Sequence, residues 1–201
     1  MTPVLYLDYD GVLHPADVRV TEAEPLRPRV YNGGPTDHPL FEHAPLLEHV
    51  LRPFADVRIV LSTSWVRVLG YEFAVQQLPA GLRGRVVGTM WREELLQHPP
   101  RARYDAIQTD AVARGLDRWL ALDDDLEGWP GAQRYRVIAP NNSWLGLSQP
   151  GRAEELAEAL ALLCAGLPLE SRMPKVAHFP STVERLFGSV EPAQLLRRHN
   201  E

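Results

Sequence analysis

Three short apolar runs of this chain each end abruptly in polar side chains. The runs are Val4–Leu7, Arg58–Leu61 and Trp119–Leu122, and the residues that follow them are Asp8, Ser62 and Asp123. Buried strands of a parallel sheet are nearly continuous apolar runs, and such sheets bind ligands beyond the carboxyl ends of their strands. We therefore predict a parallel sheet with its functional site where these runs end.

Segments with helical patterning lie between the apolar runs. We predict helices at 45–52, 65–77, 104–114 and 152–164, and further short strands at 85–87 and 134–139. In the last of these helices, apolar residues such as Leu156 and Leu160 share one face. Because strands alternate with helices, the expected fold class is α/β, with three layers around a central parallel sheet.

The composition fits one globular domain. The chain has 201 residues, of which 45% are hydrophobic, and a formal net charge of −5. This acidity argues against a protein that coats DNA, which would carry a strongly basic stripe. The single cysteine, Cys164, excludes an internal disulfide, and no run of about 18 apolar residues could cross a membrane. We therefore expect a cytoplasmic protein without membrane contact.

Two segments do not fit simple strand–helix alternation. Segment 14–43 is rich in Pro, Gly, His and Asp and is too long for a plain connection, so we predict a small flap or hairpin there. The tail 168–201 has weak periodicity, apart from possible short helices at 183–187 and 193–198. We predict a domain at 1–167 and a C-terminal extension that packs on it or at an interface.

Four aspartates are expected to crowd at the carboxyl edge of the sheet, since Asp8 and Asp10 follow one strand and Asp123 and Asp124 follow another. At an effective dielectric constant near 20, two carboxylates about 4 Å apart repel each other by ~4 kcal/mol. A divalent cation removes this repulsion, and an all-oxygen set suits Mg²⁺ better than Zn²⁺. Beside such a cation, Asp8 could attack a phosphoryl group while Asp10 donates a proton to the leaving oxygen.

These motifs carry a family resemblance. Residues 7–14 (LDYDGVLH) resemble the first motif of the haloacid dehalogenase (HAD) superfamily of phosphohydrolases. Residues 59–62 (IVLS) resemble its second motif, and residues 120–124 (LALDD) its fourth. The resemblance covers 4–163 and implies a Rossmann-like fold, Mg²⁺ as cofactor and an aspartyl-phosphate intermediate. No interval is long enough for a large cap domain, so bulky substrates are compatible with the site.

The resemblance also implies a role for each site residue. Asp8 would be the nucleophile and a metal ligand, and Asp10 the acid/base and a ligand through its carbonyl oxygen. Asp123 would be the third ligand, supported by Asp124. Hydrogen bonds to the phosphoryl oxygens would come from Ser62, with Thr63 as the alternative, and Gly11 would also lie at the substrate.

The third motif of the superfamily requires a cation, normally lysine, between the second and fourth motifs. The only lysine of this chain is Lys175, which lies outside that interval. The best match is Arg103 at the start of a predicted helix, and Arg101 is its competitor. An arginine keeps the charge and can bind phosphate through two parallel hydrogen bonds, so activity is compatible with the replacement.

A narrower resemblance points to a class of substrate. Residues 62–65 (STSW) and 144–148 (WLGLS) resemble a HAD subgroup linked to RNA repair, which implies phosphorylated RNA or DNA ends as substrates. Two alternatives stay open. The first is a phosphatase for nucleotides or sugar phosphates, with the flap as its lid. The second is a non-catalytic binding or regulatory module, although an unused cluster of buried carboxylates would destabilise the fold.

Several neighbouring residues also have structural explanations. Asp125 is expected to cap a turn, since two acidic residues suffice for the metal. For His14 we weigh a place in the pocket against a packing role, and for Trp65 we weigh the core against stacking on a base. The histidines expected at the surface rather than at a zinc ion are His38, His43 and His49.

Overall fold

A five-stranded parallel sheet forms the centre of the computed structural model, which describes residues 2–21, 24–30, 38–97, 100 and 102–172. The strand order is β5-β4-β1-β6-β7. The strands are β1 (Val4–Leu7), β4 (Arg58–Leu61), β5 (Val86–Thr89), β6 (Trp119–Leu122) and β7 (Val137–Ile138). The predicted parallel sheet, built on the three apolar runs, is confirmed.

The register of the central strands aligns their carboxyl ends. Leu7 of β1 pairs with Leu61 of β4 on one side and with Leu122 of β6 on the other. The next residue of each strand therefore leaves the sheet at the same level. This alignment brings the side chains that follow β1, β4 and β6 to one site.

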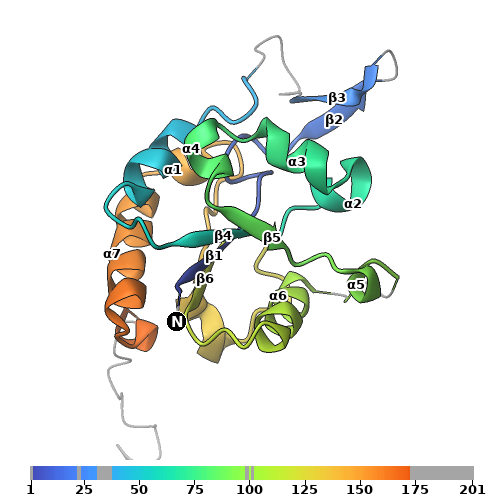
Figure 1. Ribbon diagram of the computed structural model, residues 1–201. Helices are drawn as coiled ribbons and strands as arrows, with labels where there is room; N and C mark the ends of the chain where they lie inside the picture. Colours follow the sequence, from blue (N-terminus) through green and yellow to red (C-terminus); the bar gives the residue numbers. More distant parts are fainter. Residues whose placement is uncertain (1, 22–23, 31–37, 98–99, 101, 173–201) are drawn as a thin grey trace, which may run out of the picture.

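Helices cover both faces of the sheet, which confirms the three-layer, Rossmann-like architecture (Figure 1). One face is covered by α1 (Ala44–Leu51) and α7 (Arg152–Ala165), which contact each other, and the other by α6 (Arg103–Ala113). The helices between β4 and α6 are short. They are α2 (Trp65–Leu69), α3 (Tyr71–Gln77), α4 (Ala80–Arg83) and α5 (Glu93–Gln97).

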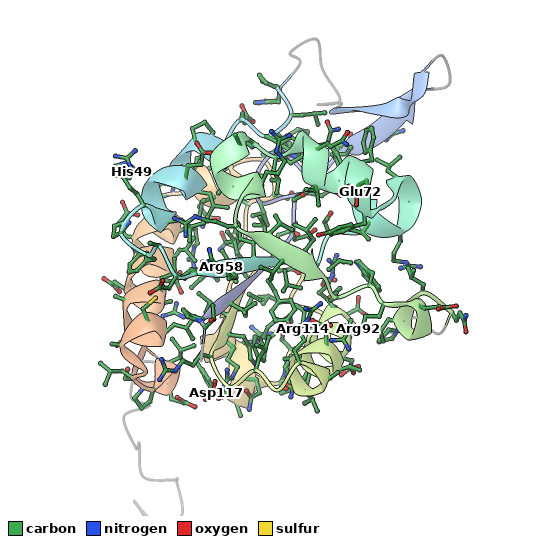
Figure 2. The ribbon with its side chains drawn as sticks, viewed as in Figure 1. His49, Arg58, Glu72, Arg92, Arg114 and Asp117 are labelled. Carbon is green, nitrogen blue, oxygen red and sulfur yellow. The ribbon has the colours of Figure 1, made fainter. Side chains whose placement is uncertain are left out.

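A buried carboxylate connects β1 to α6. Asp110 of α6 is 1% exposed, and its Oδ2 accepts hydrogen bonds from the Tyr6 hydroxyl (2.8 Å) and Arg114 Nε (2.6 Å). Its Oδ1 forms an ion pair with Arg92 Nη2 at 2.8 Å. Figure 2 shows Arg92 and Arg114 together beside α6. These contacts hold α6, which begins at Arg103, against the central strand.

Two predictions about secondary structure are wrong. The single helix predicted at 65–77 is two helices, because Gly70 has φ 91° and separates α2 from α3. The strand predicted at 134–139 is reduced to β7, and the residues before it form a 3₁₀ turn, Gly131–Arg136. In that turn the Tyr135 carbonyl oxygen accepts a hydrogen bond from Arg172 Nη1 (2.9 Å) instead of joining the sheet.

Segment 14–43 contains the predicted hairpin, in which β2 (Val18–Thr21) pairs antiparallel with β3 (Glu24–Val30). Figure 1 shows this hairpin projecting from the edge of the molecule. Between β4 and α6 the described chain holds only short helices and β5, which agrees with the predicted absence of a large cap domain. None of the described helices is long and apolar enough to span a membrane.

The start of the predicted C-terminal extension packs on the domain. A 3₁₀ turn, Leu169–Arg172, follows α7, and Leu169 is buried. Arg172 Nη2 lies 2.6 Å from Glu155 Oε1 of α7. The short helices predicted at 183–187 and 193–198 lie outside the described residues, so the division at 167 stays a prediction.

Candidate active site

Three carboxylates meet beyond the carboxyl ends of β1 and β6. One oxygen each from Asp8, Asp123 and Asp124 lies within 4.8 Å of the others. Asp8 is 3% exposed and Asp123 is fully buried. Asp123 Oδ1 accepts a hydrogen bond from the backbone N–H of Asp125 (3.1 Å), whereas its Oδ2 has no hydrogen-bond partner among the described residues. A buried carboxylate oxygen that accepts no hydrogen bond is costly unless a cation binds it.

The crowding disfavours the charged form of all three groups. Burial and the charge of Asp8 raise the pKa of Asp123 well above its ordinary value. Burial raises the pKa of Asp8 too, with a contribution from Asp10 and against the opposing effect of Arg103. The pKa of Asp124 rises to about 6, from burial and from the charge of Asp8. A divalent cation would stabilise the carboxylates in this cluster, so the donor set fits the predicted Mg²⁺.

Arg103 places a cation at this cluster. Its Nη2 lies 3.3 Å from Asp8 Oδ2 and its Nε lies 3.7 Å from Asp123 Oδ2, and its Nη1 donates a hydrogen bond to the Ser62 carbonyl oxygen. Burial alone would lower the pKa of Arg103, but Asp8 and Asp123 outweigh it and raise the pKa. The competing candidate, Arg101, lies outside the described residues.

Ser62 and Thr63, the two residues that follow β4, are fully buried. The hydroxyl of Ser62 has no hydrogen-bond partner among the described residues, although its backbone N–H donates to the Leu7 carbonyl oxygen (2.9 Å). Thr63 Oγ1 accepts a hydrogen bond from the backbone N–H of Trp65 (3.3 Å), which orders the first turn of α2. The Ser62 hydroxyl is therefore a buried donor that lacks a hydrogen-bond partner in the part of the chain that the structure describes.

Trp91 supports the same segment and was not singled out from the sequence. Its indole N–H donates to the carbonyl oxygens of Ser62 (3.1 Å) and Thr63 (2.8 Å). The guanidinium of Arg67 lies over its ring, 4.9 Å from the centroid. The direction of a lone tryptophan N–H depends on tertiary packing, so no sequence signal could have found this contact.

The carboxylate of Asp10 is not one of the three that meet at the cluster. Both of its oxygens accept hydrogen bonds from the indole N–H of Trp65 (3.0 and 3.1 Å), and His14 Nε2 lies 3.1 Å from Oδ1. This leaves the carbonyl oxygen of Asp10 as its predicted contribution to the metal. Its carboxyl group, 27% exposed, is available for another task.

At two glycines near the site, the lack of a side chain lets other atoms of the protein lie close to the backbone. A Cβ on Gly11, which has φ 67°, would lie 2.0 Å from Asp124 Oδ2. A Cβ on Gly146, in the segment 144–148, would lie 2.4 Å from the Val12 carbonyl oxygen. The absence of a side chain at Gly11 therefore leaves the space that the Asp124 carboxylate occupies.

The remaining predicted residues lie at the edges of the site or away from it. Asp125 caps a turn, as predicted, because its Oδ1 accepts a hydrogen bond from the backbone N–H of Glu127 (2.8 Å). His38 Nδ1 lies 3.0 Å from Glu42 Oε1, and His49 lies on the outer surface of α1 (Figure 2). Among the described residues, no group of metal ligands includes a histidine.

The domain is a hydrolase domain of the HAD superfamily. Its class is defined by the parallel sheet together with the polar residues that follow three of its strands: the paired aspartates after β1, the serine after β4 and the acidic pair after β6. More specifically, the chain belongs to the family described as the HAD domain in Swiss Army Knife RNA repair proteins, whose family model matches residues 4–151. The resemblance predicted from the motifs is thereby confirmed. No curated protein and no solved structure matches the chain in the same comparisons.

Proposed function

We propose that this domain is a Mg²⁺-dependent phosphatase that works through an aspartyl-phosphate on Asp8. The observation that carries the proposal is the convergence of a buried nucleophile, a cation and an unpartnered donor. Arg103 Nη2 lies 3.3 Å from Asp8, and the Ser62 hydroxyl beside them has no partner among the described residues. A phosphoryl group needs this combination, because its oxygens carry negative charge and accept hydrogen bonds.

The metal would be held by Asp8, Asp123 and the Asp10 carbonyl oxygen, with Asp124 supporting it. Two observations support this assignment: Oδ2 of Asp123 accepts no hydrogen bond from a described residue, and the pKa of each carboxylate in the cluster is raised. When bound, Mg²⁺ supplies charge that stabilises the phosphoryl oxygens during transfer.

The chain's own residues account for the two chemical steps. A carboxylate oxygen of Asp8 attacks phosphorus, and the bond from phosphorus to the leaving oxygen breaks while Asp10 gives that oxygen a proton. Asp10 then removes a proton from water, whose oxygen bonds to phosphorus as the Asp8–phosphorus bond breaks. Asp8 returns to a carboxylate, Asp10 to a carboxylic acid, and phosphate is released. Ser62, Thr63 and Arg103 hold the phosphoryl oxygens, and Gly11 leaves room beside them.

The experiment is a phosphatase assay of the full chain on an aryl phosphate with and without Mg²⁺. We expect turnover that EDTA abolishes, and Asp8→Asn should be inactive because an amide cannot attack phosphorus. Asp117→Asn is a matched control, because Asp117 is exposed at the opposite end of the molecule (Figure 2). Turnover in Asp8→Asn equal to that of the wild type would overturn the mechanism.

For the substrate, we infer a phosphorylated nucleic-acid end. The family description names RNA repair proteins. A groove of about 530 Å³ begins at Ser64, directly after the phosphate-binding segment, and is also lined by Arg67, Val68 and Leu96. Val68 is 72% exposed, so the groove combines apolar surface with one cation. This combination suits a nucleoside and the next phosphodiester of a strand.

The single cysteine and the absence of a membrane-spanning helix among the described residues are compatible with the cytoplasm, where we place the activity.

A comparison of substrates tests this assignment. We expect a 3′- or 5′-phosphorylated oligonucleotide to have a lower KM than a nucleotide or a sugar phosphate. Arg67→Gln should raise the KM for the oligonucleotide and leave that for an aryl phosphate unchanged. The exposed Arg83→Gln, on α4, is the control. Preference for free nucleotides or sugar phosphates would favour the small-molecule alternative, and no hydrolysis of any of these phosphoesters would favour a binding module.

A further inference from the structure

The carboxyl group of Asp10 accepts hydrogen bonds from two side chains that have no role in the proposed mechanism. The indole N–H of Trp65 is shared between Oδ1 and Oδ2, at 3.0 and 3.1 Å, and His14 Nε2 lies 3.1 Å from Oδ1. A donor that contacts both oxygens fixes the plane of the carboxyl group as well as its position. Rotation of the Asp10 side chain would break at least one of these contacts.

The hydrogen bonding of His14 defines its tautomer. The backbone N–H of Phe41 points at His14 Nδ1, 3.3 Å away, so Nδ1 is an acceptor and carries no proton. In this neutral form Nε2 carries the hydrogen and donates a hydrogen bond to Asp10 Oδ1. His14 is fully buried, and its ring packs against those of Phe41 (4.9 Å between centroids) and Trp65 (5.5 Å).

Aromatic rings pack closely around these donors. The Tyr9 ring lies edge-on to those of Phe41 (5.0 Å) and Trp65 (5.5 Å), and its hydroxyl donates to the Ala74 carbonyl oxygen (2.9 Å). Trp65 is 4% exposed and is the first residue of α2. One short segment, 62–65, therefore contains both the predicted phosphate ligands and a donor to Asp10.

We infer that Trp65 and His14 are positioning residues that hold the Asp10 carboxyl group in the orientation needed to protonate the leaving oxygen. Both donors are neutral, so they orient Asp10 without adding formal charge beside the phosphate. The inference rests on the proposed phosphatase function. It extends that function by giving a role to the tryptophan of the STSW segment.

The leaving group of the substrate separates this role from a merely structural one. An aryl phosphate such as p-nitrophenyl phosphate expels a stable anion that needs little protonation, whereas an alkyl phosphate expels an alkoxide that must be protonated. General acid catalysis contributes about 10²–10⁴-fold when it is required. If the Asp10 carboxyl group is no longer held in position, kcat should therefore fall for the alkyl phosphate and stay nearly unchanged for the aryl phosphate.

The test measures kcat and KM on both substrates for Trp65→Phe, which keeps the ring packing and removes the N–H donor. We expect kcat to fall about 10–100-fold for the alkyl phosphate, a part of the general-acid contribution, and by less than about threefold for the aryl phosphate. KM should stay unchanged for both. Asp10→Asn is the reference variant, because removal of the proposed general acid should show the same dependence of kcat on the leaving group. Trp119→Phe, at a buried tryptophan that begins β6 at the opposite end of the strand from the site, is the control.

His14 provides a second, independent pair of variants, which keeps the inference testable if Trp65→Phe does not fold. His14→Gln can place its side-chain N–H near the position of Nε2, whereas His14→Leu cannot donate. We expect Gln to restore most of the alkyl-phosphate turnover that Leu loses. Equal losses of kcat on both substrates, or equal alkyl-phosphate turnover of His14→Gln and His14→Leu, would overturn the positioning role but not the proposed phosphatase function. A wild-type protein inactive on both substrates would overturn the proposed function and the inference with it.

Discussion

Arg103 Nη2 lies 3.3 Å from Oδ2 of Asp8, the carboxylate proposed as nucleophile. The contact depends on the place where α6 begins. Arg103 is the first residue of this helix, and a Cβ on Gly128 would lie 2.2 Å from Cβ of Ala102, so the loop after β6 closes tightly on the start of the helix. An arginine fixed in this way can replace the lysine that the superfamily pattern calls for.

Two replacements of Arg103 should therefore distinguish the effect of its positive charge on activity from the effect of its forked donor geometry. Arg103→Gln removes the cation from a buried pair of carboxylates, and we expect kcat/KM on an aryl phosphate to fall about 100-fold or more, or ~2.7 kcal/mol of transition-state stabilisation. Arg103→Lys keeps the charge without the forked donor geometry and should retain more activity than Gln. Steady-state kinetics at saturating Mg²⁺ would measure this order, and equal activity of Gln and wild type would contradict it.

Gly11→Ala should weaken metal binding. The new Cβ would lie 2.0 Å from Asp124 Oδ2, so this carboxylate must move, and the φ of 67° adds a backbone cost of about 1–2 kcal/mol. Gly70→Ala is the matched control, because Gly70 also has positive φ but a Cβ there would meet no atom within 4 Å. We expect both variants to melt at lower temperature and Gly11→Ala alone to need more Mg²⁺ for half-maximal activity. An unchanged Mg²⁺ requirement would argue against Asp124 as a supporting residue.

The sheet and the carboxylate cluster follow from local patterns in the sequence, whereas the contacts that orient the site do not. The apolar run before Asp8 predicts a buried strand, and parallel pairing then brings Asp123 to the same edge. Trp65 and Trp91, by contrast, donate to partners 55 and 28–29 positions away in the chain. Only the packing of α2 and of the loop after β5 directs those N–H groups. Positive φ at Gly70 was missed for a similar reason, since a glycine inside a helical pattern is compatible with either outcome.

The metal-free protein should lose stability as the pH rises through about 6. Burial raises the pKa of Asp124 from an ordinary 3.8 to about 6, and Asp8 and Asp123 are shifted in the same direction. Because the folded state binds these protons more tightly than the unfolded state, their contribution to stability is present at low pH and is lost with deprotonation. Thermal melts in EDTA between pH 5 and 7.5 would measure the trend. Asp124→Asn should flatten it, and a melting temperature that rises over this range in EDTA would contradict the shifts.

Asp110→Ala should destabilise the fold more than it impairs the chemistry. The substitution removes the acceptor of the buried Tyr6 hydroxyl and the ion-pair partner of Arg92 and Arg114, whose side chains are 40% and 25% exposed. An unsatisfied buried donor costs about 1–3 kcal/mol, whereas the partly exposed arginines can be rehydrated. Asp110 lies two helical turns from Arg103, about 10 Å along α6, so the start of the helix can keep its contact with Asp8. Urea unfolding measures the loss, with the exposed Asp117→Asn expected within about 0.5 kcal/mol of wild type. If Asp110→Ala kept full stability, the buried carboxylate would not be what holds α6 to β1. If it lost stability and most of its kcat at a temperature where it is folded, the position of Arg103 would depend on this contact as well.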